Sequence, residues 1–263
     1  MMQVAGIDIG AGTAKAVIMS DSNITSYSVK RISNNVVKAA EEVTSEALDK
    51  AGLSLSNLDY VVATGWGRNA VSFANKTSSE IICHASGVYF LMPQVRTVID
   101  IGAQDSKVTR VNEKGEVVDF IMNDKCAAGT GRFLEVMAQV LGITLEEMGP
   151  LSLTSENPCS ISSTCTVFAE TEVISLRAEG KHMNDLIAGI HRAIASRIIV
   201  MGSGIGFDKG TVFTGGVAKN SGVKEALEEA GQVKITVPKE PQITGALGAA
   251  LIAQVELTQA ASV

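Results

Sequence analysis

The chain has 263 residues, of which 46% are hydrophobic and 19% charged, the balance of a globular protein with one large core or two modest lobes. Its 22 basic and 28 acidic side chains give a formal net charge of −6, without any basic run, which argues against a nucleic-acid surface. The N-terminus opens on an apolar strand without a basic leader, and no apolar stretch is expected to reach the roughly 20 residues that span a bilayer. We therefore expect a cytoplasmic protein that binds neither membrane nor nucleic acid.

The first part of the chain is predicted to form strands and short helices punctuated by glycine. Apolar runs predict strands over 4–9, 15–19, 25–30 and 60–63. Helical spacing predicts a helix over 35–51 that ends at Gly52, and a shorter one over 84–91 that Pro93 ends. Residues 97–107 then repeat the opening layout of an apolar strand, Asp-Ile-Gly, a small polar turn and a lysine. This internal repeat predicts a duplicated α/β unit.

The rest of the chain is mainly helical. Strands are expected over 117–122, 211–214 and 233–237, and helices over 130–141, 169–179, 186–201, 217–230 and from 245 onward. This order predicts a first lobe over 1–95, to which the closing helix 245–263 returns, and a second lobe over 96–244.

Four glycine-rich motifs follow apolar strands or open a helix: DIGAGT at 8–13, DIGAQD at 100–105, TGGVAKN at 214–220 and TGALGAA at 244–250. A hairpin turn of small residues points successive backbone N–H groups inward and forms an anion-binding concavity. The two Asp-Ile-Gly turns therefore predict a phosphate clamp. Asp8 and Asp100 are expected to hold Mg²⁺ through its waters, because Mg²⁺ dehydrates reluctantly. A P-loop site is excluded, since the chain has no GxxxxGK[ST] sequence.

Together the four motifs resemble the actin, sugar-kinase and heat-shock-chaperone ATPase superfamily over nearly the whole chain. The resemblance implies an α/β fold of two lobes, each a ribonuclease-H-like unit, with ATP or ADP in the cleft between them. It implies cofactor-binding residues at the phosphates and the nucleoside, namely Ala11, Gly12, Thr13, Ala14, Lys15, Gly215, Gly216, Asn220 and Gln242. It also implies a catalytic set of Asp8, Asp100 and Gln104, with Gln104 beside the attacking water. An amide orients water but cannot deprotonate a hydroxyl, which favours hydrolysis over transfer.

The four cysteines show no CxxC pattern for zinc, and a reducing cytosol disfavours disulfides. Cys126 in NDKCAAGTGRF and Cys165 in ISSTCTVFAE are each expected just before a helix, whose N-terminal N–H groups favour a thiolate and hydrogen-bond the sulfurs of a cluster. Two thiolates are too few for one cluster, but a two-fold dimer presents four. Cys83 lies in an apolar run and is expected to be a core thiol, while Cys159 is the competing ligand candidate.

These two cysteine motifs, with GIHRAIASR at 189–197, resemble the family of 2-hydroxyacyl-CoA dehydratase activators, the BadF/BadG/BcrA/BcrD ATPases, which also contains benzoyl-CoA reductase subunits. The resemblance implies an oxygen-sensitive homodimer from an anaerobic system, with one 4Fe-4S cluster held by Cys126 and Cys165 of both chains. It further implies that ATP hydrolysis drives an electron from ferredoxin or flavodoxin to a separate dehydratase.

Three other functions are alternatives to the activator. An ATPase subunit of a benzoyl-CoA-type reductase would carry the same motifs. A small-molecule kinase, such as an amino-sugar kinase, would need a catalytic carboxylate in the first lobe, and the segment 64–80 offers none before Glu80, which argues against it. A non-enzymatic filament or chaperone would not need paired cysteines at helix starts.

Overall fold

The computed structural model describes residues 2–33, 35–162 and 165–260. Residues 163–164 of the Cys165 motif and 261–263 of the predicted closing helix lie outside the described residues. The chain divides into two compact units: unit 1 is Met1–Val95, Val111–Val118 and Pro238–Val263, and unit 2 is Arg96–Arg110 and Asp119–Val237. These units differ from the predicted lobes at 111–118 and 238–244.

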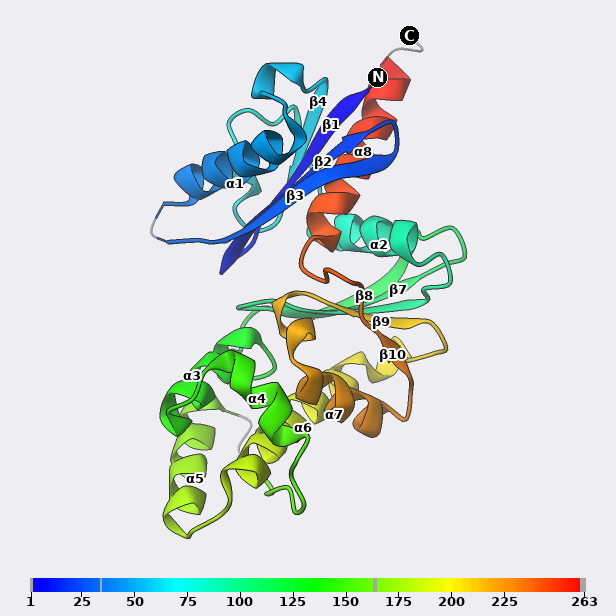
Figure 1. Cartoon of the computed structure of the whole chain (residues 1–263). Coiled ribbons are helices and arrows are strands. Elements are labelled where there is room, and N and C mark those ends of the chain that lie inside the picture. The colour runs from blue at the N-terminus through cyan, green and yellow to red at the C-terminus, as the bar shows by residue number, and fades with distance from the viewer. Residues whose placement is uncertain (1, 34, 163–164, 261–263) are drawn as a thin grey trace. The chain divides into compact units, whose positions relative to one another are not determined.

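Unit 1 is built on a five-stranded sheet in the order β3-β2-β1-β4-β5. Its strands are β1 (Gln3–Ile9), β2 (Thr13–Ser20), β3 (Asn23–Arg31), β4 (Tyr60–Thr64) and β5 (Lys76–Thr77), and its helices are α1 (Val36–Ala51), α2 (Glu80–Leu91) and α8 (Thr244–Ala260). The first three strands are antiparallel neighbours, and β4 runs parallel to β1. Helix α1 covers one face of the sheet, while α8, drawn in red in Figure 1, packs on the other face together with α2.

The central strand β1 alternates between these two helical layers, as a strand buried on both faces must. Ile7 packs in the core under α1, whereas Val4 packs in the core under α8. Gly6 also faces α8, and a Cβ at this position would collide with the carbonyl oxygen of Ala246. Glycine therefore lets the helix lie directly against the strand. Asp8 follows on the same face, so the start of α8 is held close to its carboxylate.

Unit 2 repeats the sheet order of unit 1, as β8-β7-β6-β9-β10. The strands of this sheet are β6 (Thr97–Ile101), β7 (Ser106–Val111), β8 (Val117–Asn123), β9 (Thr211–Thr214) and β10 (Ile235–Thr236), of which the end of β7 and the start of β8 belong to unit 1. Strand β6 pairs antiparallel with β7 and parallel with β9, just as β1 pairs with β2 and β4. The predicted duplication is therefore confirmed.

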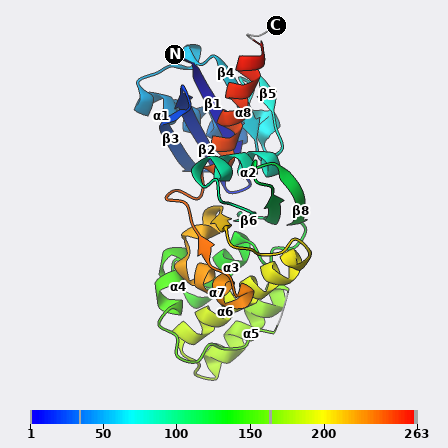
Figure 2. The same ribbon diagram turned by 90° about the vertical axis from the view of Figure 1, so that its right-hand side faces the viewer.

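The helices of unit 2 gather on one face of its sheet (Figure 2). They are α3 (Gly131–Leu141), α4 (Leu145–Ser152), α5 (Thr166–Ala178), α6 (Met183–Met201) and α7 (Ser221–Gly231). Helix α6 contacts α4, α5 and α7, and buries Leu186, Ile190 and Ile194 in their shared core. The expectation that no apolar stretch is long enough to span a bilayer is wrong. By length and composition, Met183–Gly204 could cross a membrane, but more than half of its apolar window is buried inside the protein.

Most predicted elements are present, and the differences are local. Helix α2 begins at Glu80 rather than at residue 84, and β10 has two residues instead of five. The helix expected over 217–230 is a 3-10 turn, Gly216–Lys219, followed by α7, because Asn220 interrupts it as an N-cap. Helix α4 was not predicted, although Thr144 and Glu147 form a capping box at its start.

Candidate functional site

The first Asp-Ile-Gly turn joins β1 to β2 in unit 1. Asp8 lies opposite Lys15, and the Lys15 Nζ is 3.0 Å from the Asp8 Oδ2. Both side chains are largely buried, so each charge compensates the lost hydration of the other. The Gly10 N–H donates to the carbonyl of Thr13 and closes the turn, which leaves Ala11 exposed at its tip. A lysine ammonium fixed beside an exposed turn of small residues can pair with phosphate oxygens, to which the N–H groups of the turn can donate hydrogen bonds.

Two glycines make room for the Asp8 carboxylate. Gly65 has a φ of +84°, and a Cβ there would lie 2.5 Å from the Asp8 Oδ1. A Cβ at Gly245, in the first turn of α8, would lie 3.0 Å from the Asp8 Oδ2. The TGALGAA motif therefore meets the DIGAGT motif within unit 1. Gln242, expected near the nucleoside, lies just before this helix turn and is half-buried.

The second Asp-Ile-Gly turn, in unit 2, has equivalent parts. Asp100 lies opposite Lys107, whose Nζ is 3.5 Å from the Asp100 Oδ2 and 2.9 Å from the Asp105 Oδ2. The Thr214 hydroxyl donates to the Asp100 Oδ1 at 3.1 Å, and all four side chains are buried. The site residues predicted from sequence omitted Lys107 and Asp105. The identical spacing from Asp8 to Lys15 and from Asp100 to Lys107 is the signal that points to Lys107.

The turn itself is also duplicated. The Gly102 N–H donates to the Asp105 carbonyl, as the Gly10 N–H does in unit 1. Gly215 corresponds to Gly65: its φ is +86°, and a Cβ there would lie 2.8 Å from the Asp100 Oδ1. Gln104 lies at the tip of this turn with its side chain exposed, where it can reach a ligand in solvent.

The TGGVAKN motif connects β9 to α7, and its last residue is a helix cap. The Asn220 Oδ1 accepts hydrogen bonds from the N–H groups of Gly222 and Val223 at 3.0 and 3.1 Å. The Asn220 Nδ2 donates to the Nε2 of His191 at 3.2 Å. The side-chain oxygen is thus committed to the cap, and the expected contact of Asn220 with the nucleoside stays a prediction.

His191 is a buried residue of α6 that supports this cap. Its Nδ1 lies 2.9 Å from the Oγ of Ser152, and that hydroxyl donates its own proton to the Gly149 carbonyl. The Nδ1 must therefore carry the imidazole hydrogen, which leaves Nε2 as the acceptor for Asn220. Burial lowers the pKa of His191 to about 4, so the ring is neutral at physiological pH.

Cys126 lies half-buried in the loop between β8 and α3. Asn123 holds this loop: its Nδ2 donates to the carbonyls of Cys126 and Ala128 at 2.8 and 3.3 Å, and its Oδ1 accepts from the Cys126 N–H at 3.2 Å. Cys126 precedes a helix, as expected, but residues 127–130 lie between the thiol and the start of that helix. Helix α3 begins at Gly131 with Thr130 as its N-cap, because the intervening residues form a turn.

Cys165 is exposed and is the N-cap residue of α5, as expected from the sequence. The following Thr166 has a buried Oγ1 that lacks a hydrogen-bond partner in the described part of the chain. The side chains of Val167 and Phe168 are 66% and 68% exposed. These two side chains therefore form an exposed apolar pair beside the thiol.

The other two cysteines are less suited to act as thiolates. Cys83 is fully buried in α2, as predicted for a core thiol, and burial raises its pKa. Burial also raises the pKa of the half-buried Cys159. Among the residues that the structure describes, no three His, Cys, Asp or Glu side chains gather in one chain to hold a metal ion.

The comparisons with known proteins agree with these features. The model of the BadF/BadG/BcrA/BcrD ATPase family matches residues 5–253. The activator of lactoyl-CoA dehydratase from Anaerotignum propionicum is 47% identical over 96% of this chain and 97% of its own. The (R)-2-hydroxyglutaryl-CoA dehydratase activating ATPase from Acidaminococcus fermentans is 46% identical over 94% of this chain and 95% of its own.

Solved structures agree as well. The activator of the 2-hydroxyisocaproyl-CoA dehydratase from Clostridium difficile with bound ADPNP is 44% identical, with a TM-score of 0.95 over 99% of this chain and 97% of that one. A ROK family glucokinase from Streptomyces griseus, 13% identical, has a TM-score of 0.62 over 96% of this chain and 99% of its own. The second likeness concerns the fold alone, and together they confirm the predicted two-lobed ATPase fold.

Proposed function

Because this chain belongs to the BadF/BadG/BcrA/BcrD ATPase family, we propose that it is the ATP-hydrolysing activator of a 2-hydroxyacyl-CoA dehydratase. The observation that carries the proposal is the identity of 46–47% to two such activators over nearly their whole length. The partner would be a separate dehydratase in the cytoplasm, and the electron donor would be ferredoxin or flavodoxin.

ATP would place its phosphates at the two Asp-Ile-Gly turns. In unit 1, the backbone of residues 11–14 would donate to phosphate oxygens, and Lys15 would supply the counter-charge. Asp8 would hold that lysine in place across the hairpin. In unit 2, Lys107 has the equivalent position and is held by two carboxylates. The nucleoside would lie near Gly215, Gly216, Asn220 and Gln242.

Mg²⁺ would be held by Asp8 and Asp100 through its waters. Lys15 already pairs with Asp8, while Thr214 and Lys107 occupy both oxygens of Asp100, so direct coordination would disrupt buried interactions. Gln104 would orient the attacking water. Because an amide does not act as a base toward a hydroxyl, this residue supports hydrolysis rather than phosphoryl transfer.

A 4Fe-4S cluster fits the chemistry of Cys126 and Cys165, since thiolates are its usual ligands. The Thr166 hydroxyl beside Cys165, which lacks a partner among the described residues, could donate a hydrogen bond to a cluster sulfur. Two copies of the chain would supply four thiolates on a two-fold axis, and the exposed Val167 and Phe168 support a homodimer at this surface. When bound, such a cluster supplies one-electron transfer at low potential.

Helix α3 offers a route from the nucleotide to the Cys126 loop. The N–H groups of Gly131 and Arg132 donate to the carbonyls of Gly102 and Ala103, both at 2.8 Å. These carbonyls belong to the turn that carries Gln104. A nucleotide-dependent shift of that turn would therefore move the start of α3 and the loop before it. This connection supports ATP-driven electron transfer.

Anaerobic purification with iron reconstitution tests the cluster. We expect one cluster per two chains, and loss of both iron and dimer in Cys126→Ser and Cys165→Ser, with ATP binding preserved. Cys159→Ser is the matched control and should keep its iron. Wild-type protein that stays colourless after reconstitution would contradict the cluster, as would a cluster potential that is the same with ADP and with an ATP analogue.

Co-purification and electron transfer test the partner. Reduced ferredoxin or flavodoxin, ATP and this protein should together activate a 2-hydroxyacyl-CoA dehydratase, and activation should stop when ATP is replaced by ADP. Isolation of the chain within a benzoyl-CoA-type reductase would instead assign it to that enzyme. ATP-dependent phosphorylation of an amino sugar would favour the kinase.

A further inference from the structure

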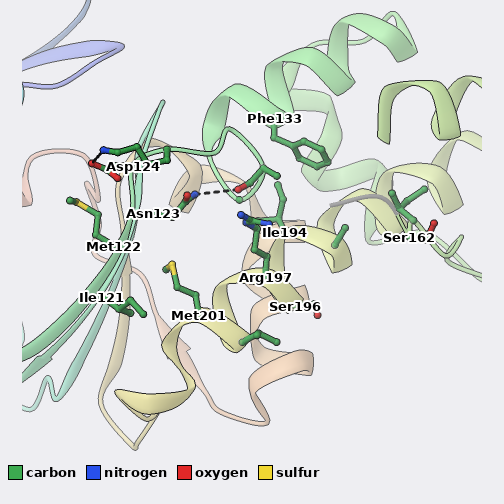
Figure 3. A pocket seen from close by; sticks show the side chains of 16 residues that line it. Ile121, Met122, Asn123, Asp124, Phe133, Ser162, Ile194, Ser196, Arg197 and Met201 are labelled. Carbon is green, nitrogen blue, oxygen red and sulfur yellow. Dashed lines mark hydrogen bonds and ion pairs between the residues drawn. The ribbon is translucent and has the colours of Figure 1, made fainter. Parts of the chain in front are cut away.

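A cavity of about 590 Å³ lies in unit 2 beside the Cys126 loop (Figure 3). Its wall includes Lys125, Ala128 and Gly129, the neighbours of Cys126 in the chain. The end of β8, Phe133 of α3, residues 161–162 and helix α6 supply the rest, which is largely apolar apart from Asp124 and Arg197. Arg197 of α6 points its guanidinium toward the loop in this view.

Arg197 packs against the backbone of the loop. A Cβ at Gly129 would lie 3.0 Å from the Arg197 Cδ and 3.5 Å from its Nε, so glycine at this position leaves room for the arginine side chain. Gly129 has a φ of +88°, which also favours glycine. The guanidinium is therefore held close to the loop that carries Cys126.

The charge of Arg197 has no counter-charge in the described part of the chain. Neither an ion pair nor a hydrogen bond joins its half-buried guanidinium to those residues. Arg192, on the same helix, differs: it is bound by Glu229 through two hydrogen bonds of 3.2 and 2.8 Å. A cation partly removed from water without a counter-charge is costly, so the position favours an anionic group nearby.

We propose that Arg197 is a positioning residue that acts as the positive counter-charge of the cluster site at Cys126 and makes the cluster easier to reduce. The inference rests on the proposed cluster. A cluster with four thiolate ligands carries a net negative charge, which grows by one on reduction. A nearby cation shielded from water stabilises the more negative state. Two-fold symmetry would supply Arg197 from both chains.

The test is an anaerobic redox titration of reconstituted protein with ADP bound, followed by electron paramagnetic resonance. Arg197→Gln should keep its iron but show about a tenfold lower ratio of reduced to oxidised cluster at a fixed potential, a shift of about 59 mV to lower potential. Arg197→Lys should stay near the wild type because it keeps the charge. Arg192→Gln is the surface control on the same helix and should not change the potential.

A second neutral variant, Arg197→Met, separates charge from packing. Both neutral variants should shift the potential in the same direction. The electrostatic role would be overturned if the cluster potential were unchanged in both neutral variants, or if it shifted equally in Arg192→Gln. Loss of iron from both neutral variants with intact circular dichroism would overturn it as well. Wild-type protein without iron would instead refute the proposed cluster, and with it the basis of this inference.

Discussion

Replacing Gly215 by alanine should destabilise unit 2 and remove ATP binding. Gly215 has a φ of +86° and a ψ of 179°, a region open essentially to glycine alone, and an L-residue there costs about 1–3 kcal/mol. The new Cβ would also collide with the Ile101 carbonyl and lie 2.8 Å from the Asp100 Oδ1. Overpacking of this kind costs about 1–3 kcal/mol more. The expected total is about 2–6 kcal/mol.

Gly52→Ala is the matched control for this prediction. Gly52 also has a positive φ, +67°, but a Cβ there meets nothing within 4 Å, so it should cost only about 1–2 kcal/mol. Urea unfolding of the nucleotide-free protein measures both free energies, and isothermal titration calorimetry measures ATP affinity. Gly215→Ala should lose more stability than the control and most of its ATP affinity. Equal losses in the two variants, or intact ATP binding in Gly215→Ala, would refute the reasoning.

Three further predictions concern His191, Lys15 and Gln104. Burial lowers the pKa of His191 to about 4, so as the pH falls the imidazole is protonated in the unfolded chain before it is protonated in the folded one. The neutral, buried His191 therefore contributes its full stability above pH 6.5, and the free energy of unfolding falls by up to about 3 kcal/mol between pH 6.5 and 4. Urea unfolding across this window should show a shallower slope for His191→Asn, and an equal slope would contradict the assignment. Lys15→Gln leaves the Asp8 carboxylate buried without its ion-pair partner, so the free energy of unfolding should fall by about 3–5 kcal/mol in the same assay. ATP binding should also weaken. Unaltered stability would argue against the ion pair. Gln104→Ala should lower the single-turnover rate of ATP hydrolysis about 100-fold with little change in ATP affinity, since the attacking water loses its orientation; a loss of affinity alone would assign Gln104 to binding.

Local chemistry accounts for what could be predicted from the sequence. The two Asp-Ile-Gly turns follow short buried strands, and their repetition predicted the duplicated sheets. Helix α1 ends at Gly52, as expected, because glycine adopts the left-handed conformation of its C-cap. Helix α3 was placed to within one residue, but the hydrogen bonds by which Asn123 holds the Cys126 loop were not predicted, since they leave little trace in residue type.

The four glycine-rich motifs, the two cysteine motifs and most of the strands and helices can be predicted from the sequence, because each depends on neighbouring residues. The pairing of distant residues, in contrast, depends on how the chain folds. The fold brings His191 to Asn220, Arg197 to the Cys126 loop, and α3 to the turn that carries Gln104. Spacing along the chain does not specify such contacts, because they arise when separate helices and strands pack on a common core.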